Sequence, residues 1–298
     1  KKYYNNEISS KDSFLAATNI AFDVSIWEIF MPILNGARLV FNTEEIIKDI
    51  SLYTNNIMNN NITAMYIPPN ILDETFTILN KRNYTKLSKL LVGVESITNT
   101  TLNKYIKLNP NIKIVNGYGP TETTICATAL QYKYDNTSTH IIPIGKPLYN
   151  NKVYILSHSS LCPPNVPGEL YVAGVGVGHG YLNNTSKTNS VFIEDLFFKN
   201  NLMYNTGDLA YWDSTGLLHF IGRKDNQIKL HGYRIELSEI DSKLNTYPDI
   251  QKSFSIVKNN NIITYYLSKD EINSSILKSY LSESLPFYMI PSFFIRLS

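Results

Sequence analysis

The first part of the chain alternates short apolar segments with segments of helical spacing, and this order constrains the fold more than any other feature. Four segments have the apolar, β-rich character of strands: residues 38–41, 62–67, 89–92 and 112–115. Three segments between them carry apolar residues at roughly helical spacing: residues 44–58, 70–81 and 100–108. Strands separated by helices are typical of a parallel sheet, so we predict an α/β fold. Ligands of such sheets bind beyond the carboxyl ends of the strands.

The residues that follow the fourth strand have the chemistry of a nucleotide site. Gly117 and Gly119 allow a mobile turn and a close backbone approach, and Tyr118 offers a flat face for a purine. Thr121 can donate a hydrogen bond to a phosphate oxygen, and Glu122 can hold a magnesium ion against the phosphates. The same residue types also fit a tight loop in which Thr121 caps the next helix. Residue types alone leave both interpretations open.

Six sequence blocks, in order along the chain, resemble those of the adenylation domains of nonribosomal peptide synthetases. These domains belong to the acyl-adenylate-forming superfamily, together with acyl-CoA ligases and firefly luciferase. The blocks are residues 22–28, residues 116–124, residues 168–174 with 180–182, residues 204–209, residues 222–229 with 232–237, and residues 285–291. The resemblance therefore covers nearly the whole chain.

The resemblance implies an ATP and Mg²⁺ site. It assigns nucleotide binding to Asn116, Gly117, Tyr118, Gly119, Thr121, Asp208, Phe220 and Arg223, and catalysis to Thr121, Glu122 and Arg223. Asp208 is expected to accept hydrogen bonds from both ribose hydroxyls, and Glu122 is expected to bind the metal. Read locally, Asp208 could instead be an Asx-type turn residue after Thr206 and Gly207.

The resemblance also implies an amino-acid pocket in which Asp23 pairs with the α-ammonium group of the substrate. Local sequence favours a different role, because Asp23 precedes a predicted helix over residues 24–34 and Asp is a preferred N-cap. The implied lining is Val24, Trp27, Tyr66, Leu91, Gly93, Gly117, Ile125 and Cys126. Because this lining has no charged partner for a side chain, a neutral substrate is expected. Space at Gly93 and Gly117 favours an aromatic or large aliphatic amino acid, although Tyr66 could hydrogen-bond a polar group.

The implied reaction forms an aminoacyl adenylate and transfers it to the phosphopantetheine thiol of a peptidyl carrier protein, beside a condensation domain of the same synthetase. Residues 1–224 are expected to form the C-terminal part of the large domain, with the α/β sheet and pocket in 1–138 and a β subdomain in 139–224. Residues 225–298 are expected to form a truncated α+β lid that rotates about Asp225. The alternatives are an acyl-CoA or aryl-CoA ligase of the same superfamily and a noncatalytic docking segment.

Two elements of the family pattern, the phosphate loop and a late lysine, are not found in the sequence, so we expect a fragment that is inactive or slow by itself. A net charge of +2 argues against a nucleic-acid partner. No apolar run approaches the ~18 residues of a membrane span. Only Cys126 and Cys162 occur, without metal-ligand spacing, which fits a cytoplasmic protein. The glycine-rich segment 174–178 is interpreted as a structural turn, because it lacks the strand, loop and helix of a dinucleotide site.

Overall fold

The computed structural model describes residues 7–136, 140–224, 227–230, 233–259 and 261–297. The chain divides into two compact units, residues 1–224 and residues 225–298. No helix in the described part of the chain is long and apolar enough to cross a membrane.

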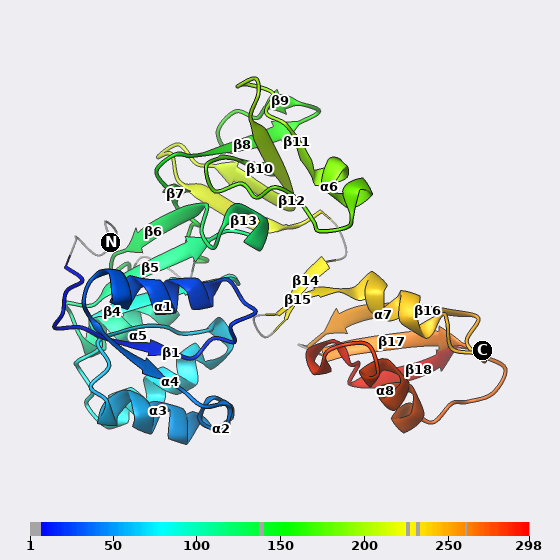
Figure 1. Ribbon diagram of the computed structural model, residues 1–298, viewed down its shortest axis with the longest axis horizontal. Coiled ribbons are helices and arrows are strands. Elements are labelled where there is room, and N and C mark those ends of the chain that lie inside the picture. The colour runs from blue at the N-terminus through cyan, green and yellow to red at the C-terminus, as the bar shows by residue number, and fades with distance from the viewer. Residues whose placement is uncertain (1–6, 137–139, 225–226, 231–232, 260, 298) are drawn as a thin grey trace. The chain divides into compact units, whose positions relative to one another are not determined.

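The first unit contains a seven-stranded sheet in the order β2-β1-β3-β4-β5-β6-β7 (Figure 1). Its strands are β1 (Ser13–Ala16), β2 (Arg38–Phe41), β3 (Ala64–Tyr66), β4 (Lys89–Gly93), β5 (Lys113–Tyr118), β6 (Thr128–Tyr132) and β7 (Lys146–Pro147). The pairs among β1 to β5 are parallel, and β6 and β7 extend the sheet in antiparallel fashion. The predicted α/β class is therefore confirmed.

Helices cover both faces of this sheet (Figure 1). They are α1 (Val24–Leu34), α2 (Glu44–Lys48), α3 (Ile50–Asn59), α4 (Pro69–Lys81) and α5 (Asn99–Leu108). Successive strand residues point to opposite faces. Leu90 and Ile114 accordingly pack with α3, α4 and α5 in one apolar cluster, whereas Leu91 and Val115 pack with α1 in another.

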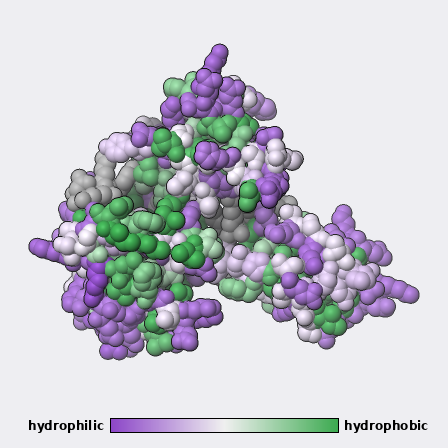
Figure 2. All heavy atoms as spheres, viewed as in Figure 1, coloured by the Kyte–Doolittle hydropathy of each residue, from purple (hydrophilic) through white to green (hydrophobic). Residues whose placement is uncertain are grey.

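Helix α1 also has an apolar face that remains exposed. Val24, Ser25, Glu28 and Pro32 are the buried residues of this helix. The exposed apolar residues on it are Ile26, Phe30, Ile33 and Leu34. Figure 2 shows green, hydrophobic side chains gathered over this part of the first unit.

Two local predictions for this unit were wrong. The single helix expected over residues 44–58 is two helices, because Asp49 adopts an extended conformation and its side chain accepts hydrogen bonds from the amides of Ser51 and Leu52. The mobile glycine turn expected within residues 116–124 begins later than predicted, because residues 116–118 are the end of strand β5. Gly117 pairs there with Gly93 of β4 and Ala129 of β6.

The rest of the first unit is a β subdomain with a six-stranded sheet, in which β11-β12-β10-β8-β9 are consecutive and β13 pairs with β12. Its elements are β8 (Asn151–Ser157), β9 (Ser160–Leu161), β10 (Gly168–Gly174), α6 (Thr185–Val191), β11 (Phe192–Glu194), β12 (Leu202–Trp212) and β13 (Leu218–Arg223). Asp208 lies inside β12 and pairs with Arg223 of β13, so it is a strand residue and not a turn residue.

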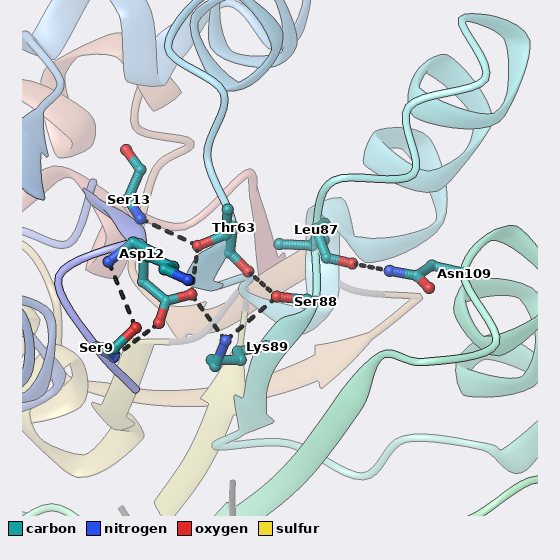
Figure 3. Close-up of polar contacts among 9 residues, drawn as sticks. Ser9, Asp12, Ser13, Thr63, Leu87, Ser88, Lys89 and Asn109 are labelled. Atoms are coloured by element: carbon teal, nitrogen blue, oxygen red, sulfur yellow. Dashed lines mark hydrogen bonds and ion pairs between the residues drawn. The ribbon is translucent and has the colours of Figure 1, made fainter. Parts of the chain in front are cut away.

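A buried polar network joins β1, β3 and β4 at their amino ends (Figure 3). The Lys89 ammonium lies 2.7 Å from Asp12 Oδ1, and both side chains are under one-tenth exposed. Asp12 also accepts hydrogen bonds from the Thr63 hydroxyl and the Ser9 amide. This arrangement satisfies the carboxylate away from water, as a buried charge requires.

The second unit has a two-stranded sheet of β14 (Gln227–Leu230) and β15 (Tyr233–Glu236), and a three-stranded sheet in the order β16-β17-β18. The latter contains β16 (Lys252–Lys258), β17 (Asn261–Leu267) and β18 (Phe293–Leu297), and the helices are α7 (Leu237–Leu244) and α8 (Ser274–Ser282). Its core contains Ile240, Leu244, Tyr266, Leu277 and Leu281.

Candidate functional site

A small pocket lies at the carboxyl ends of β3, β4 and β5, with a cavity volume of ≈ 30 Å³. It is lined by Asp23, Val24, Tyr66, Leu91, Val92, Gly93, Val94, Gly117, Gly119, Ile125 and Cys126. Residues from α1, three strands and the segment after β5 therefore meet where a parallel sheet is expected to bind its ligand. The pocket includes Asp23 and every predicted lining residue except Trp27.

Asp23 is the acidic residue of the pocket lining. Its backbone is helical, with φ −63° and ψ −24°, and its side chain makes no hydrogen bond that caps α1. Asp23 thus stands at the N-cap position of α1, as the local sequence predicts, but its side chain does not cap the helix. Asp23 Oδ2 is buried and has no hydrogen-bond partner among the described residues. A buried acceptor without a partner is costly, and an ammonium group would satisfy it.

Trp27 lies elsewhere on α1. Its ring packs against Phe14, with centroids 5.6 Å apart, in the apolar cluster beneath the helix. Three lining residues were not predicted for this pocket: Val92, Val94 and Gly119. Val92 and Val94 flank Gly93 at the end of β4, so the strand pattern was a usable signal for them. Gly119 had been assigned to the nucleotide.

Two of the three pocket glycines, Gly93 and Gly117, leave no space for a side chain. A Cβ atom on Gly93, which has φ +150°, would lie 2.1 Å from the Gly117 carbonyl oxygen. A Cβ atom on Gly117 would lie 2.6 Å from Cys126 Sγ. These glycines therefore do more than leave room for a substrate, because they let β4, β5 and the Cys126 segment approach closely.

Two other pocket-lining residues, Val94 and Ile125, have positive φ values of +74° and +64°. Thr124, which precedes Ile125 in the chain, has a φ of +63°. The left-handed region is unfavourable for β-branched residues, and such strain concentrates at functional sites. Burial, together with the nearby charge of Asp23, raises the pKa of Cys126 to about 12, so the thiol stays protonated at neutral pH.

A second polar cluster joins strands β5, β12 and β13. Asp208 Oδ1 accepts a 2.9 Å hydrogen bond from Arg223 Nη1, and Asp208 Oδ2 accepts one from the Tyr118 hydroxyl. Arg223 also donates to the Thr206 carbonyl. The Tyr118 ring lies 6.2 Å from Phe220 between centroids. The structure thus brings together four of the residues expected to bind nucleotide.

Tyr118 and Asn116 are more enclosed than the sequence suggested. Tyr118 is 5% exposed, and burial raises its pKa, so its hydroxyl remains a donor to Asp208. Asn116 is buried, and its amide donates to the Pro143 carbonyl oxygen at 3.0 Å. Stacking of a purine on Tyr118 and ribose binding by Asp208 stay predictions.

Glu122 lies in a short 3₁₀ turn, Thr121–Thr123, after β5. No side chain caps this turn, so the alternative in which Thr121 caps a helix is wrong. Glu122 Oε1 accepts a 2.5 Å hydrogen bond from the Tyr181 hydroxyl. Among the residues that the structure describes, no three His, Cys, Asp or Glu side chains form a metal-binding group. Mg²⁺ commonly binds through one or two carboxylates plus substrate phosphates, and Glu122 fits that mode. The predicted hinge residue Asp225 lies outside the described residues.

Comparisons with known proteins show the family and the fold that this chain shares. The family described as AMP-binding enzyme matches residues 2–182. The chain is 33% identical to tyrocidine synthase 1 of Brevibacillus parabrevis over 97% of this chain and 27% of that protein. It is 36% identical to bacitracin synthase 1 of Bacillus licheniformis over 98% of this chain and 6% of that protein. The chain thus spans about a quarter or less of these two relatives.

A solved structure shares the fold. It is a nonribosomal peptide synthetase protein that contains adenylation and PCP domains bound to a vinylsulfonamide inhibitor. The TM-score is 0.86 at 26% identity, and the match covers 98% of this chain and 51% of that chain.

Proposed function

The chain belongs to the AMP-binding enzyme family, and we propose that it activates a neutral amino acid as part of the adenylation domain of a nonribosomal peptide synthetase. The observation that carries this proposal is the buried Asp23 Oδ2, which has no partner among the described residues and lies in an otherwise uncharged pocket. An α-ammonium group is the complement that such an oxygen requires. Fatty and aryl acids carry no such group.

The remaining residues of the pocket lining support a substrate amino acid whose side chain is neutral and apolar or aromatic. Leu91, Val92, Val94 and Ile125 contribute apolar surface, and none of the described residues that line the pocket is basic. A charged substrate side chain would therefore be buried without a partner. The Tyr66 hydroxyl is the polar exception, and burial raises its pKa, so it stays protonated.

In the proposed reaction the amino-acid carboxylate attacks the α-phosphorus of ATP, and pyrophosphate leaves with the electrons of the broken bond. Asp23 orients the amino acid through its ammonium group. Asp208 binds the ribose and Arg223 contacts the nucleotide, while Thr121 donates to a phosphate oxygen. Glu122 would hold Mg²⁺, which would bear part of the charge that develops on the phosphates.

We also propose a carrier protein as the partner, because the similar solved protein contains a PCP domain next to its adenylation domain. The phosphopantetheine thiol of that carrier would attack the adenylate carbonyl and displace AMP. A condensation domain of the same synthetase would then use the thioester. The two described cysteines are unpaired, which supports a cytoplasmic location.

The test is amino-acid-dependent exchange of pyrophosphate into ATP by the complete polypeptide, with every proteinogenic amino acid in turn. We expect exchange with one neutral amino acid. Turnover with an aryl or fatty acid but with no amino acid would favour an acyl-CoA or aryl-CoA ligase. Absence of activity with every acid would favour a noncatalytic docking segment.

Asp23→Ala sharpens this test. We expect it to lower kcat/KM for the amino acid by about one to two orders of magnitude, since a charge-assisted hydrogen bond is lost. Its stability should not fall, because the variant removes a buried acceptor without a partner. The matched control is Asp49→Ala, which removes the cap of α3 and should cost about 1 kcal/mol of stability while sparing exchange. An unchanged kcat/KM for the amino acid in Asp23→Ala would count against the proposal.

A further inference from the structure

A glycine-rich segment of the β subdomain, residues 174–181, packs against the turn that carries Glu122. The Gly178 amide donates to the Glu122 carbonyl oxygen at 2.8 Å. The Thr124 hydroxyl donates to the Gly176 carbonyl oxygen, also at 2.8 Å. The Tyr181 hydroxyl donates to Glu122 Oε1 at 2.5 Å. Two segments more than fifty residues apart in the sequence are thus joined at three points.

Gly176 is needed for that approach, and Gly178 eases it. A Cβ atom on Gly176 would lie 2.8 Å from the Thr123 carbonyl oxygen, which is closer than real Cβ contacts come. A Cβ atom on Gly178 would lie 3.3 Å from the Glu122 carbonyl oxygen. The glycine spacing that imitates a dinucleotide loop therefore serves the packing of one backbone segment on another.

Tyr181 is itself held in place from several directions. Its ring packs edge-on against Phe192, with centroids 5.6 Å apart. Its backbone amide donates to the Thr188 hydroxyl at 2.9 Å, and its own hydroxyl lies 3.3 Å from the Tyr204 hydroxyl. The donor that reaches Glu122 is therefore fixed by the β subdomain and not by the Glu122 turn.

We propose that Tyr181 is a positioning residue that orients the Glu122 carboxylate for a divalent cation, with the segment 174–180 holding the turn beneath it. This inference rests on the proposed function, which gives Glu122 its metal. A carboxylate offers about four acceptor positions, and the hydrogen bond from Tyr181 constrains the orientation of Glu122 Oε1. Hydrogen bonds to metal ligands typically change metal affinity by about 10–100-fold.

The test is Tyr181→Phe in the complete polypeptide, which removes the hydroxyl and keeps the ring against Phe192. Binding of Mn²⁺ in the presence of a nonhydrolysable ATP analogue, followed by the electron paramagnetic resonance of free Mn²⁺, should weaken about tenfold. The apparent KM for Mg²⁺ in pyrophosphate exchange should rise by a similar factor, while the KM for the amino acid stays unchanged. The matched control is Tyr154→Phe, because Tyr154 donates to Asp195 Oδ2 at 3.3 Å in the same subdomain. That variant should leave Mn²⁺ binding unchanged.

A double-mutant cycle with Glu122→Gln separates positioning from a general loss of stability. If Tyr181 acts through Glu122, Tyr181→Phe should change Mn²⁺ affinity little in the Glu122→Gln background. Wild-type Mn²⁺ affinity in Tyr181→Phe, or additive effects in the cycle, would overturn the proposal. Mn²⁺ binding is measured without an amino acid and without turnover. Failure of the proposed amino-acid activation would therefore be seen separately, because the wild-type protein would then show no pyrophosphate exchange with any amino acid.

Discussion

Glu28 shows how one buried side chain ties the pocket helix to the sheet. It lies on α1 with no exposed surface. Its Oε2 accepts from the amides of Ala17 and Thr18, just after β1, and its Oε1 accepts from the Thr18 hydroxyl at 2.9 Å. Burial raises the pKa of Glu28 to about 7, because desolvation outweighs these hydrogen bonds.

The raised pKa predicts a pH-dependent stability. Between its ordinary value of 4.5 and about 7, the folded protein holds a proton on Glu28 that the unfolded chain releases. The free energy of unfolding should therefore fall as pH rises through this window, by about 3 kcal/mol for this group. Glu28→Gln does not titrate, and its amide can accept from both backbone N–H groups and donate to Thr18. Urea unfolding should show that the free energy of unfolding of Glu28→Gln, relative to that of the wild type, increases by about 2–3 kcal/mol from about pH 5 to about pH 8. Parallel stability curves for the two proteins would contradict the assignment.

Single residues also mark the limits of prediction from sequence. The resemblance identified Asp23 and most of the pocket lining, because the pocket positions of the family could be carried over one by one onto this sequence. It could not show that Trp27 packs on Phe14, since that depends on how α1 sits on the sheet. Nor could it show the left-handed backbone of Val94 and Ile125, because β-branched residues disfavour that conformation and only tertiary packing imposes it.

Elements were predictable where the apolar period was long and uninterrupted. Helices α1, α4 and α5 begin and end within one residue of the expected bounds. The helical spacing of apolar residues continues through residues 44–58. The division into two helices at Asp49 depends on a side-chain cap, which this spacing does not reveal. Strand β12 was missed because its polar residues, Thr206 and Asp208 among them, are buried by contacts with other strands.

The network of Asp12 and Lys89 provides a test of how strands β1, β3 and β4 are joined (Figure 3). Burial by itself would raise the pKa of Asp12, but hydrogen bonds from Lys89, Ser9 and Thr63 hold it below the ordinary value. Lys89→Met leaves that carboxylate buried without its cation and should destabilise the protein by about 3–5 kcal/mol. The double variant Asp12→Asn with Lys89→Met should recover part of the loss, because no buried charge remains. If the loss in the double variant equalled the sum of the losses in Asp12→Asn and in Lys89→Met, urea unfolding would show that the pair is not coupled.

At the scale of the whole molecule, each unit has its own apolar core. In the first unit, Leu90 of β4 is fully buried among helices α3, α4 and α5. In the second unit, Leu277 of α8 is fully buried against α7 and the three-stranded sheet. Truncating either leucine leaves a cavity and should cost about 2–5 kcal/mol in its own unit.

Separate cores predict separate responses to these two substitutions. In Leu277→Ala, hydrogen exchange followed by mass spectrometry should rise in α7, β16, β17 and α8 and stay unchanged in β3 to β5. Leu90→Ala should show the reverse pattern, because exchange reports the local free energy of opening. The two variants serve as controls for each other, since both remove the same atoms from fully buried sites. If either substitution raised exchange equally in both units, the chain would unfold as one cooperative body and the two cores would not be energetically independent.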